Sequence, residues 1–282
     1  MVQICRGMHQ GTRYLVEITL ENKISIRLRN AAERLKVSSK EEIHSALKTL
    51  EIKMKAHMWK KVNSREIFGS FTRDTLLPVE FDDTADVDVL VIFDDENYER
   101  TPETYRNQLK GFAQKAFPKA EIKKDFPSVV VENAAIHFDL VPCVTETNFF
   151  SGKSYFIPDS QGEWMETDPH YITDELKSKP GRILHLIRLL KYWNVTAQRP
   201  FESIDLEKQI IDIFERNGSL ASDLIAVIDR LDSTALTSAG ADRLNTLKSR
   251  AERLERAIDA ENPHKARTQL RLIFPNLFQS ER

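Results

Sequence analysis

Residues 86–93 read Asp-Val-Asp-Val-Leu-Val-Ile-Phe, and this stretch decides the fold. It is short, apolar and rich in β-branched side chains, which predicts a strand inside a sheet. Asp86 and Asp88 stand two residues apart, so their side chains leave a strand on the same side, with Cα atoms roughly 6.5 Å apart. The valines between and after them point into the opposite layer. The pattern therefore predicts two carboxylates that converge over one spot on a rigid element.

The residues around this strand predict a mixed α/β layer. The first sixty residues have helical periodicity, and Ser39 with Glu42 is expected to form a capping box. A helix is expected over Tyr105–Ala116, and further strands over Ser128–Val131 and Ala135–Val144. This order of strand, helix and strands predicts a mixed sheet with a covering helix.

The second half of the chain predicts a separate helical lobe. Residues 151–174 are rich in Ser, Gly, Pro and Asp, and we interpret them as a surface connection. Beyond them lie four amphipathic segments, Ile183–Leu190, Leu206–Phe214, Leu220–Leu231 and Leu244–Ile258. We therefore expect a first lobe over residues 1–160 and a helical lobe over residues 161–282.

The composition is that of a globular protein, with 282 residues, 41% hydrophobic and 30% charged. Cys5 and Cys143 lack the spacing of a zinc site or a disulfide scaffold. No apolar run approaches the ~20 residues of a membrane helix, and the first residues lack a signal-peptide pattern. We therefore expect a cytoplasmic protein without a membrane partner.

Charge is separated along the chain, although the net charge is only −2. That low value argues against nucleic-acid binding through bulk charge. Residues 80–103 hold ten acids and one arginine, whereas residues 177–201 hold six basic residues and no acid. A solvated acidic loop and a basic surface helix would explain both segments. Together they would also suit a metal–polyphosphate ligand.

A third carboxylate, Asp139, lies in another apolar run, where an isolated charge is costly unless it is paired or bound to metal. A neighbouring strand could bring it beside Asp86 and Asp88. Three such donors suit Mg²⁺, and two ions could clamp the attacking and leaving oxygens of a phosphoryl transfer. A solvated strand end is the alternative for the Asp-x-Asp pair. His137 is expected to point to the other face of its strand and to be structural.

Residues 69–75, Gly-Ser-Phe-Thr-Arg-Asp-Thr, precede the first strand. Gly69 permits close backbone approach, and Ser70 brings a hydroxyl to an expected helix N-terminus, so the turn can hold phosphate. The alternative is a tight turn in which Ser70 is only an N-cap.

These three stretches, GSFTRDT at 69–75, DVDVLVIF at 86–93 and HFDLVPC at 137–143, together resemble the polymerase-β-like nucleotidyltransferases. Within that superfamily the chain looks most like the bacterial cyclic GMP-AMP synthase-like and dinucleotide-cyclase-like enzymes, the CD-NTases with their second-messenger oligonucleotide synthetase domain. The resemblance covers about residues 25–280, through FIPD at 156–159, RLLKYWN at 188–194, PFESIDLE at 200–207 and IFPNLF at 273–278. It implies an α/β (α+β) fold: a polymerase-β-like core with a mixed sheet, long N-terminal helices and a helical C-terminal lobe that completes the nucleotide cleft.

The resemblance also implies roles for the first-lobe residues. Gly69 and Ser70 would cradle the donor triphosphate. Asp86, Asp88 and Asp139 would be the catalytic carboxylates that bind two Mg²⁺ ions, or Mn²⁺, with Asp139 also facing the acceptor hydroxyl.

In the helical lobe, Lys191 and Ser203 match the residues that reach the triphosphate in this family. A lysine snorkelling from a helix edge and the N-cap of a helix over residues 204–216 are the alternatives. Ile204 departs from the pattern, because family members place an aromatic there to stack on the donor base. Tyr155 or Tyr192 could supply a ring instead, or belong to the core.

By resemblance, the chain is expected to be an enzyme that makes cyclic di- or oligonucleotide second messengers from nucleoside triphosphates and releases pyrophosphate, in antiphage signalling (CBASS). Regulatory proteins and a downstream effector that senses the product would be its partners. Two alternatives stay open: a nucleotidyltransferase that modifies a protein, RNA end or small molecule, and a non-catalytic nucleotide or RNA sensor.

Overall fold

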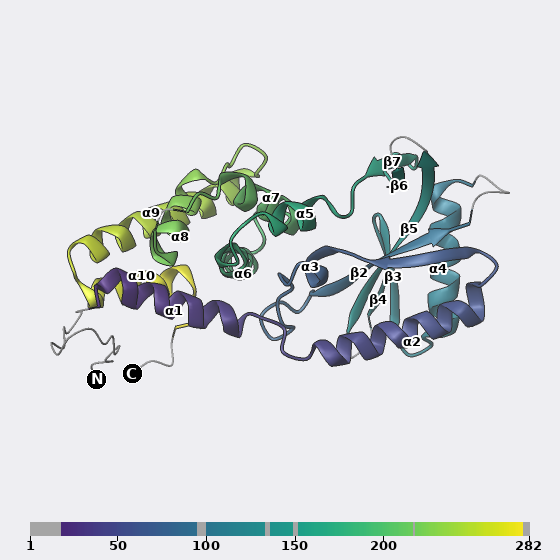
Figure 1. The fold of residues 1–282 in the computed structure, drawn as a ribbon, viewed down its shortest axis with the longest axis horizontal. Coiled ribbons are helices and arrows are strands. Elements are labelled where there is room, and N and C mark those ends of the chain that lie inside the picture. Colours follow the sequence, from purple (N-terminus) through teal and green to yellow (C-terminus); the bar gives the residue numbers. More distant parts are fainter. Residues whose placement is uncertain (1–17, 95–99, 133–135, 149–151, 217, 279–282) are drawn as a thin grey trace, which may run out of the picture. The chain divides into compact units, whose positions relative to one another are not determined.

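The structure is a computed structural model that describes residues 18–94, 100–132, 136–148, 152–216 and 218–278 (Figure 1). The chain divides into two compact units. One, the sheet unit, is Arg34–Leu184. The other, the helical unit, combines the described residues up to Glu33 with those from His185 onward. This division differs from the boundary expected at residue 160.

One mixed sheet organises the sheet unit. In the described part of the chain its strands are β1 (Val62–Ile67), β2 (Asp86–Phe93), β3 (Glu121–Asp125), β4 (Ser128–Glu132), β5 (His137–Asn148), β6 (Gly152–Pro158) and β7 (Trp164–Thr167). The order is β1-β2-β5-β4-β3, with β6 added to β5 and β7 to β6. The pair β2–β5 is parallel and the other pairs are antiparallel. The predicted mixed sheet is confirmed.

The two faces of the sheet differ in chemistry. Helices α2 (Lys40–Met58) and α4 (Pro102–Ala116) pack on one face, where Val87 and Val89 join the larger apolar core. Alternation along β2 puts Asp86 and Asp88 on the opposite face. That face has a smaller buried cluster of Leu90, Ile92, Val141 and Cys143. The two aspartates therefore stand at one end of a sheet face whose other end is apolar.

The helix α2 does start after Ser39, but the expected capping box is absent. The Ser39 side chain makes no capping hydrogen bond. Its backbone has φ −99° and ψ 56°, not the extended conformation in which a side-chain oxygen reaches the amides of the first turn. The Glu42 N–H donates to the Ser39 carbonyl instead, over 3.2 Å.

The interpretation of residues 151–174 as a surface connection is wrong for the described residues from 152 on. They form β6, β7 and the helix α5 (Tyr171–Lys177). The strand β6 pairs with the last part of β5, and β7 adds to it as an edge strand. The hairpin has only a short apolar run, residues 155–158, and most of its side chains are exposed or half-buried.

The helical unit confirms the predicted amphipathic segments. Its helices in the described chain are α1 (Leu20–Arg34), α6 (Arg182–Thr196), α7 (Ser203–Ile213), α8 (Leu220–Arg230), α9 (Ser238–Asp259) and α10 (Pro263–Ile273). The last residue of α1 and the first three residues of α6 are assigned to the sheet unit. Leu190, Leu244, Leu254 and Phe274 are buried in this unit. Among the described residues, no helix combines the length and apolarity that a membrane crossing requires.

Candidate active site

The parallel pairing of β2 and β5 brings the three predicted aspartates onto neighbouring strands. Asp139 is the register partner of Asp88, and His137 is the partner of Asp86. Residues two apart on a strand share a face. His137 therefore lies on the same side as Asp139, and the expectation that it points away is wrong.

Asp139 is in an unfavourable place for a lone charge. Burial and the negative charge of Asp86 raise its pKa to about 7, against a smaller lowering by the Ser128 hydroxyl. Ser128 Oγ donates to Asp139 Oδ2 over 3.1 Å, whereas the buried Oδ1 has no hydrogen-bond partner. A buried carboxylate oxygen without a partner is a site at which a cation or a donor would be stabilising.

Gly69 lies directly against Asp88. It is the first residue of the short helix α3 (Gly69–Thr72) and has φ +73°, a conformation that favours glycine. A Cβ at this position would lie 1.7 Å from Asp88 Oδ2. The Phe68 N–H donates to the Asp88 carbonyl over 3.2 Å, which fixes the turn to β2. Glycine is thus required by both its backbone conformation and its neighbour.

Ser70 is the second residue of α3 and is buried, so the alternative that it serves only as the N-cap is wrong. The N-cap position belongs to Phe68. The Ser70 carbonyl accepts hydrogen bonds from the N–H groups of Thr75 and Leu76 over 2.9 and 3.1 Å. These bonds close the loop that follows and hold the Gly69–Ser70 turn beside the aspartates.

The donor chemistry of this face fits a hard divalent cation. Carboxylate oxygens are the ligands that Mg²⁺ prefers, and Asp139 Oδ1 is one without a partner. In the described part of the chain, no three His, Cys, Asp or Glu side chains are close enough together to hold a metal ion. Burial first, and then the negative charge of Asp86, raise the pKa of Asp139, and a cation near these carboxylates would offset both effects.

Lys191 is buried within the helical unit, so the alternative of a snorkelling surface lysine is wrong. Its Nζ lies 2.9 Å from Oε1 of Glu207, and the two side chains are 7% and 1% exposed. Glu207 was not predicted as a site residue. It follows Ser203 by one turn of α7, so both project from one side of that helix. That spacing is the signal that could have identified it.

Ser203 is the first residue of α7, whose N-cap is Glu202, so the N-cap alternative for Ser203 is also wrong. Ile204 is 49% exposed, as a residue facing a ligand or solvent would be. Tyr192 is buried and its hydroxyl donates to the Pro275 carbonyl, which makes it a core residue of the helical unit.

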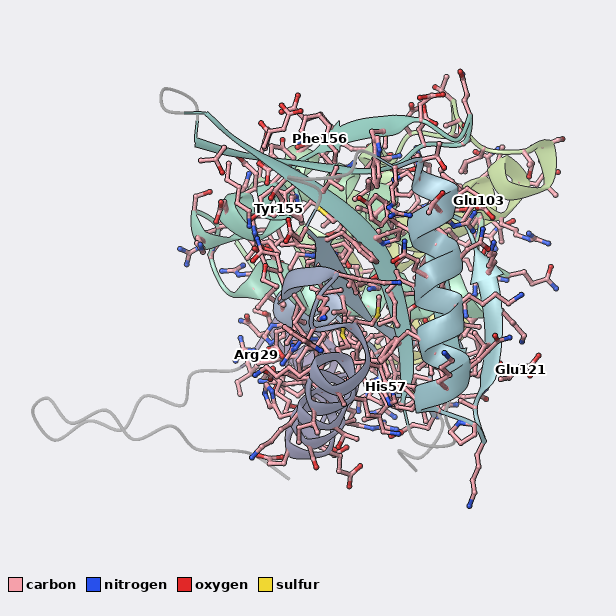
Figure 2. All side chains as sticks on the ribbon, turned by 90° about the vertical axis from the view of Figure 1, so that its right-hand side faces the viewer. Arg29, His57, Glu103, Glu121, Tyr155 and Phe156 are labelled. Atoms are coloured by element: carbon pink, nitrogen blue, oxygen red, sulfur yellow. The ribbon has the colours of Figure 1, made fainter. Side chains whose placement is uncertain are left out.

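Tyr155 belongs to a polar cluster that sequence reasoning missed. Glu66 on β1 is the register partner of Leu90, and it accepts hydrogen bonds from Lys153 Nζ at 2.8 Å and Tyr155 Oη at 2.9 Å. Burial opposes ionisation of Glu66, but these two bonds keep its pKa below the ordinary value. Figure 2 labels Tyr155 next to Phe156 on β6; Tyr155 packs on the small cluster with Leu90, whereas Phe156 packs on the larger core. The contact joins β1 and β6, two strands far apart in the sequence that do not pair with each other, so no local pattern signals it.

The raised pKa of Asp139 predicts a pH-dependent instability of the metal-free protein. Its folded pKa of about 7 exceeds the ordinary 3.8, so the folded state binds the extra proton and stability falls as pH rises between these values. We expect Asp139→Asn to raise the melting temperature at pH 8 in EDTA, corresponding to at least about 1 kcal/mol, and to have no such effect near pH 4.

Glu146→Gln on the same strand is the control, because Glu146 is exposed. It should leave the melting temperature unchanged at pH 8. An Asp139→Asn protein that is no more stable than wild type at pH 8 would show that the carboxylate is not electrostatically strained.

The chain is similar in sequence and in fold to several known proteins. A protein of Bacillus cereus (strain VD146) named probable cyclic nucleotide synthase is 32% identical over 106 residues, which is 35% of this chain and only 32% of that protein. The structure of the Bradyrhizobium diazoefficiens CD-NTase CdnG in complex with GTP matches with a TM-score of 0.65 and 11% identity, over 90% of this chain and 98% of that one. Vibrio cholerae DncV cyclic AMP-GMP synthase in complex with a linear intermediate matches with a TM-score of 0.60 and 16% identity, over 93% and 90%.

The two structural matches have low sequence identity and establish the shared fold, so the expected polymerase-β-like core is confirmed. Family membership rests on the sequence itself. Residues 23–179, more than half of the chain, match the Second Messenger Oligonucleotide or Dinucleotide Synthetase domain (SMODS). This matched range contains Gly69, Ser70 and all three aspartates. The chain belongs to this SMODS family.

Proposed function

We propose that this chain is a nucleotidyltransferase that joins ribonucleoside triphosphates into cyclic di- or oligonucleotide messengers and releases pyrophosphate. The observation that carries the proposal is the placement of Asp86, Asp88 and Asp139 on two adjacent parallel strands, with the Gly69 turn packed on Asp88. The family match and the curated relative named a probable cyclic nucleotide synthase support the same chemistry.

In the proposed mechanism, Asp86, Asp88 and Asp139 hold two Mg²⁺ ions, with Mn²⁺ as a substitute. When bound, such ions acidify the acceptor hydroxyl and neutralise charge on the transferred phosphate. Gly69 and Ser70 position the donor triphosphate through the backbone of their closed turn. Asp139 faces the acceptor, where its Oδ1, which has no other partner, can take a hydrogen bond from the attacking hydroxyl.

Lys191 and Ser203 are proposed to bind the triphosphate from the helical unit. Glu207 pairs with Lys191 in its buried position, and this one hydrogen bond leaves the other two N–H donors of the ammonium for phosphate oxygens. We further propose that the activity serves antiphage signalling in the cytoplasm, with regulatory partner proteins and an effector that senses the product.

The decisive experiment is to incubate the purified chain with the four ribonucleoside triphosphates and Mg²⁺, without primer, protein or nucleic acid. A closed ring has no terminal phosphate, so the product should survive phosphatase, yield to a phosphodiesterase that cuts internal bonds, and have the mass of nucleotide residues without an added water. Linear oligomers, or label that moves only to an added protein or RNA, would contradict the cyclase proposal and favour an acceptor-modifying enzyme.

The ion pair gives a prediction that separates binding from stability. Lys191→Ala removes the ammonium group that lies 2.9 Å from the buried Glu207, so both stability and triphosphate binding should fall. The double variant Lys191→Met/Glu207→Leu removes both charges and should recover most of the melting temperature, because buried pairs are commonly replaceable by apolar residues. We expect its KM for triphosphate to stay at least ~10-fold raised. A double variant with the wild-type KM would assign Lys191 a purely structural role.

A further inference from the structure

The helical unit contains a hollow that the proposed chemistry does not use. Its volume is about 330 Å³, and its walls come from the end of α6, the middle of α9 and the end of α10. The volume is at the lower end of the range for small-molecule sites. Its lining includes Trp193, Gln198, Arg243, Thr246, Arg250 and Leu272, and within the part of the chain that the structure describes it includes no carboxylate. The hollow is therefore suited to an anion rather than a cation.

Two arginines give the hollow its charge. Arg243 and Arg250 are seven residues apart on α9, so they lie on one face of the helix two turns apart, about 10 Å along its axis. Arg243 donates to Oε1 of Gln198, and Arg250 donates to the Leu272 carbonyl over 2.6 Å. Both acceptors are neutral. Within the described residues neither arginine forms an ion pair with an acid.

The remaining walls leave these guanidinium groups available. Each has five N–H donors, and the bonds above use one of them. The last carbonyls of α6 already have hydrogen-bond partners, because those of Trp193, Asn194 and Val195 accept the N–H groups of residues 197–199. Trp193 adds an aromatic surface to the lining. The hollow thus combines two guanidinium groups, each of which presents a fork of N–H donors that suits phosphate, with the apolar wall that Trp193 provides.

We propose that this hollow binds a small phosphorylated ligand of about nucleotide size, with phosphate oxygens on Arg243 and Arg250 and its apolar body on the Trp193 wall. None of its residues belongs to the set assigned to the donor triphosphate. The proposal is independent of the cyclase function, since it would hold equally for a chain that modifies another acceptor.

Thr246 offers a test that keeps both arginines. It is exposed and lies three residues after Arg243 and four before Arg250. Thr246→Glu would place a carboxylate between them and form helix-stabilising pairs with each. It should block phosphate binding through the new negative charge without unfolding the helix. Thr246→Gln has nearly the same shape without the charge and is the matched control.

Binding to the full-length chain would be measured by calorimetry in EDTA, which suppresses metal-dependent binding at the aspartates. The probes are ATP, inorganic pyrophosphate and adenosine. We expect ATP and pyrophosphate to bind the wild type and Thr246→Gln alike, Thr246→Glu and Arg243→Gln/Arg250→Gln to lose at least ~10-fold in affinity, and adenosine to bind at least ~10-fold more weakly than ATP. ATP binding much more tightly than pyrophosphate would identify a nucleotide, and equal binding would identify the phosphate group alone.

Exposed arginines of the same helix provide the second control. Arg253→Gln/Arg256→Gln removes two charges outside the hollow and should leave affinity unchanged. The proposal is overturned if this control loses as much affinity as Arg243→Gln/Arg250→Gln, if Thr246→Glu binds ATP like the wild type, if adenosine binds as tightly as ATP, or if neither phosphorylated probe binds saturably.

Discussion

Asp86→Asn and Asp88→Asn are each expected to reduce the rate of nucleotide joining at least ~10²-fold while the protein stays folded. Asparagine keeps the volume of aspartate and removes the charge that a metal–phosphate complex needs. Both side chains are half-buried on the polar end of the sheet face, so the core is untouched. The rate would be measured from labelled ATP and GTP under saturating Mg²⁺, with a thermal melt of each variant.

Asp83→Asn is the matched control, because Asp83 is an exposed member of the same acidic stretch. It should have the wild-type rate and a normal melt. A wild-type rate in either the Asp86 or the Asp88 variant would show that these carboxylates do not hold the catalytic metal.

Gly69→Ala is expected to be as damaging as the loss of Asp88. The added methyl would lie 1.7 Å from Asp88 Oδ2, so the carboxylate or the turn must move. A displacement of about 1 Å at Asp88, which is proposed to hold the metal, is enough to cost ~10²-fold in rate. The variant should also melt at a lower temperature, because alanine is strained at φ +73°.

Gly162→Ala separates steric contact from backbone strain. Gly162 has φ +87°, but nothing lies within 4 Å of a Cβ built there. Alanine at this position should lower stability by about 1 kcal/mol without changing the rate. If Gly69→Ala were as active as Gly162→Ala, the contact with Asp88 would not matter for function.

The strands that form the site could be predicted because their sequences are almost continuously apolar, as is typical of strands that are buried on both faces of a sheet. In β2 the apolar residues after Asp88 are continuous, and Phe138 and Leu140 flank Asp139 in β5. A charge inside such a run is conspicuous, which is why the three aspartates could be identified before the strands were paired.

Other elements could not be predicted because their sequences lack such a continuous apolar run. The strand β3, Glu-Ile-Lys-Lys-Asp, has one apolar residue and is held by pairing with β4. The strand β6 alternates too weakly to be distinguished from a loop, and tertiary pairing overrides local propensity there. The same limit applies to the pair of Lys191 and Glu207, since two surface-type residues become buried only when α6 and α7 pack together.

The parallel register of β2 and β5 also bears on how the protein folds. The strands that hold Asp88 and Asp139 are separated by α4 and the β3–β4 hairpin, so a long segment must close before they can pair. Non-local parallel pairing is slow, because the loss of chain entropy precedes the contacts that offset it. The three aspartates would thus come together late in folding, and earlier states of the chain would lack the proposed site for a divalent ion. A metal bound there would slow unfolding and would not nucleate folding.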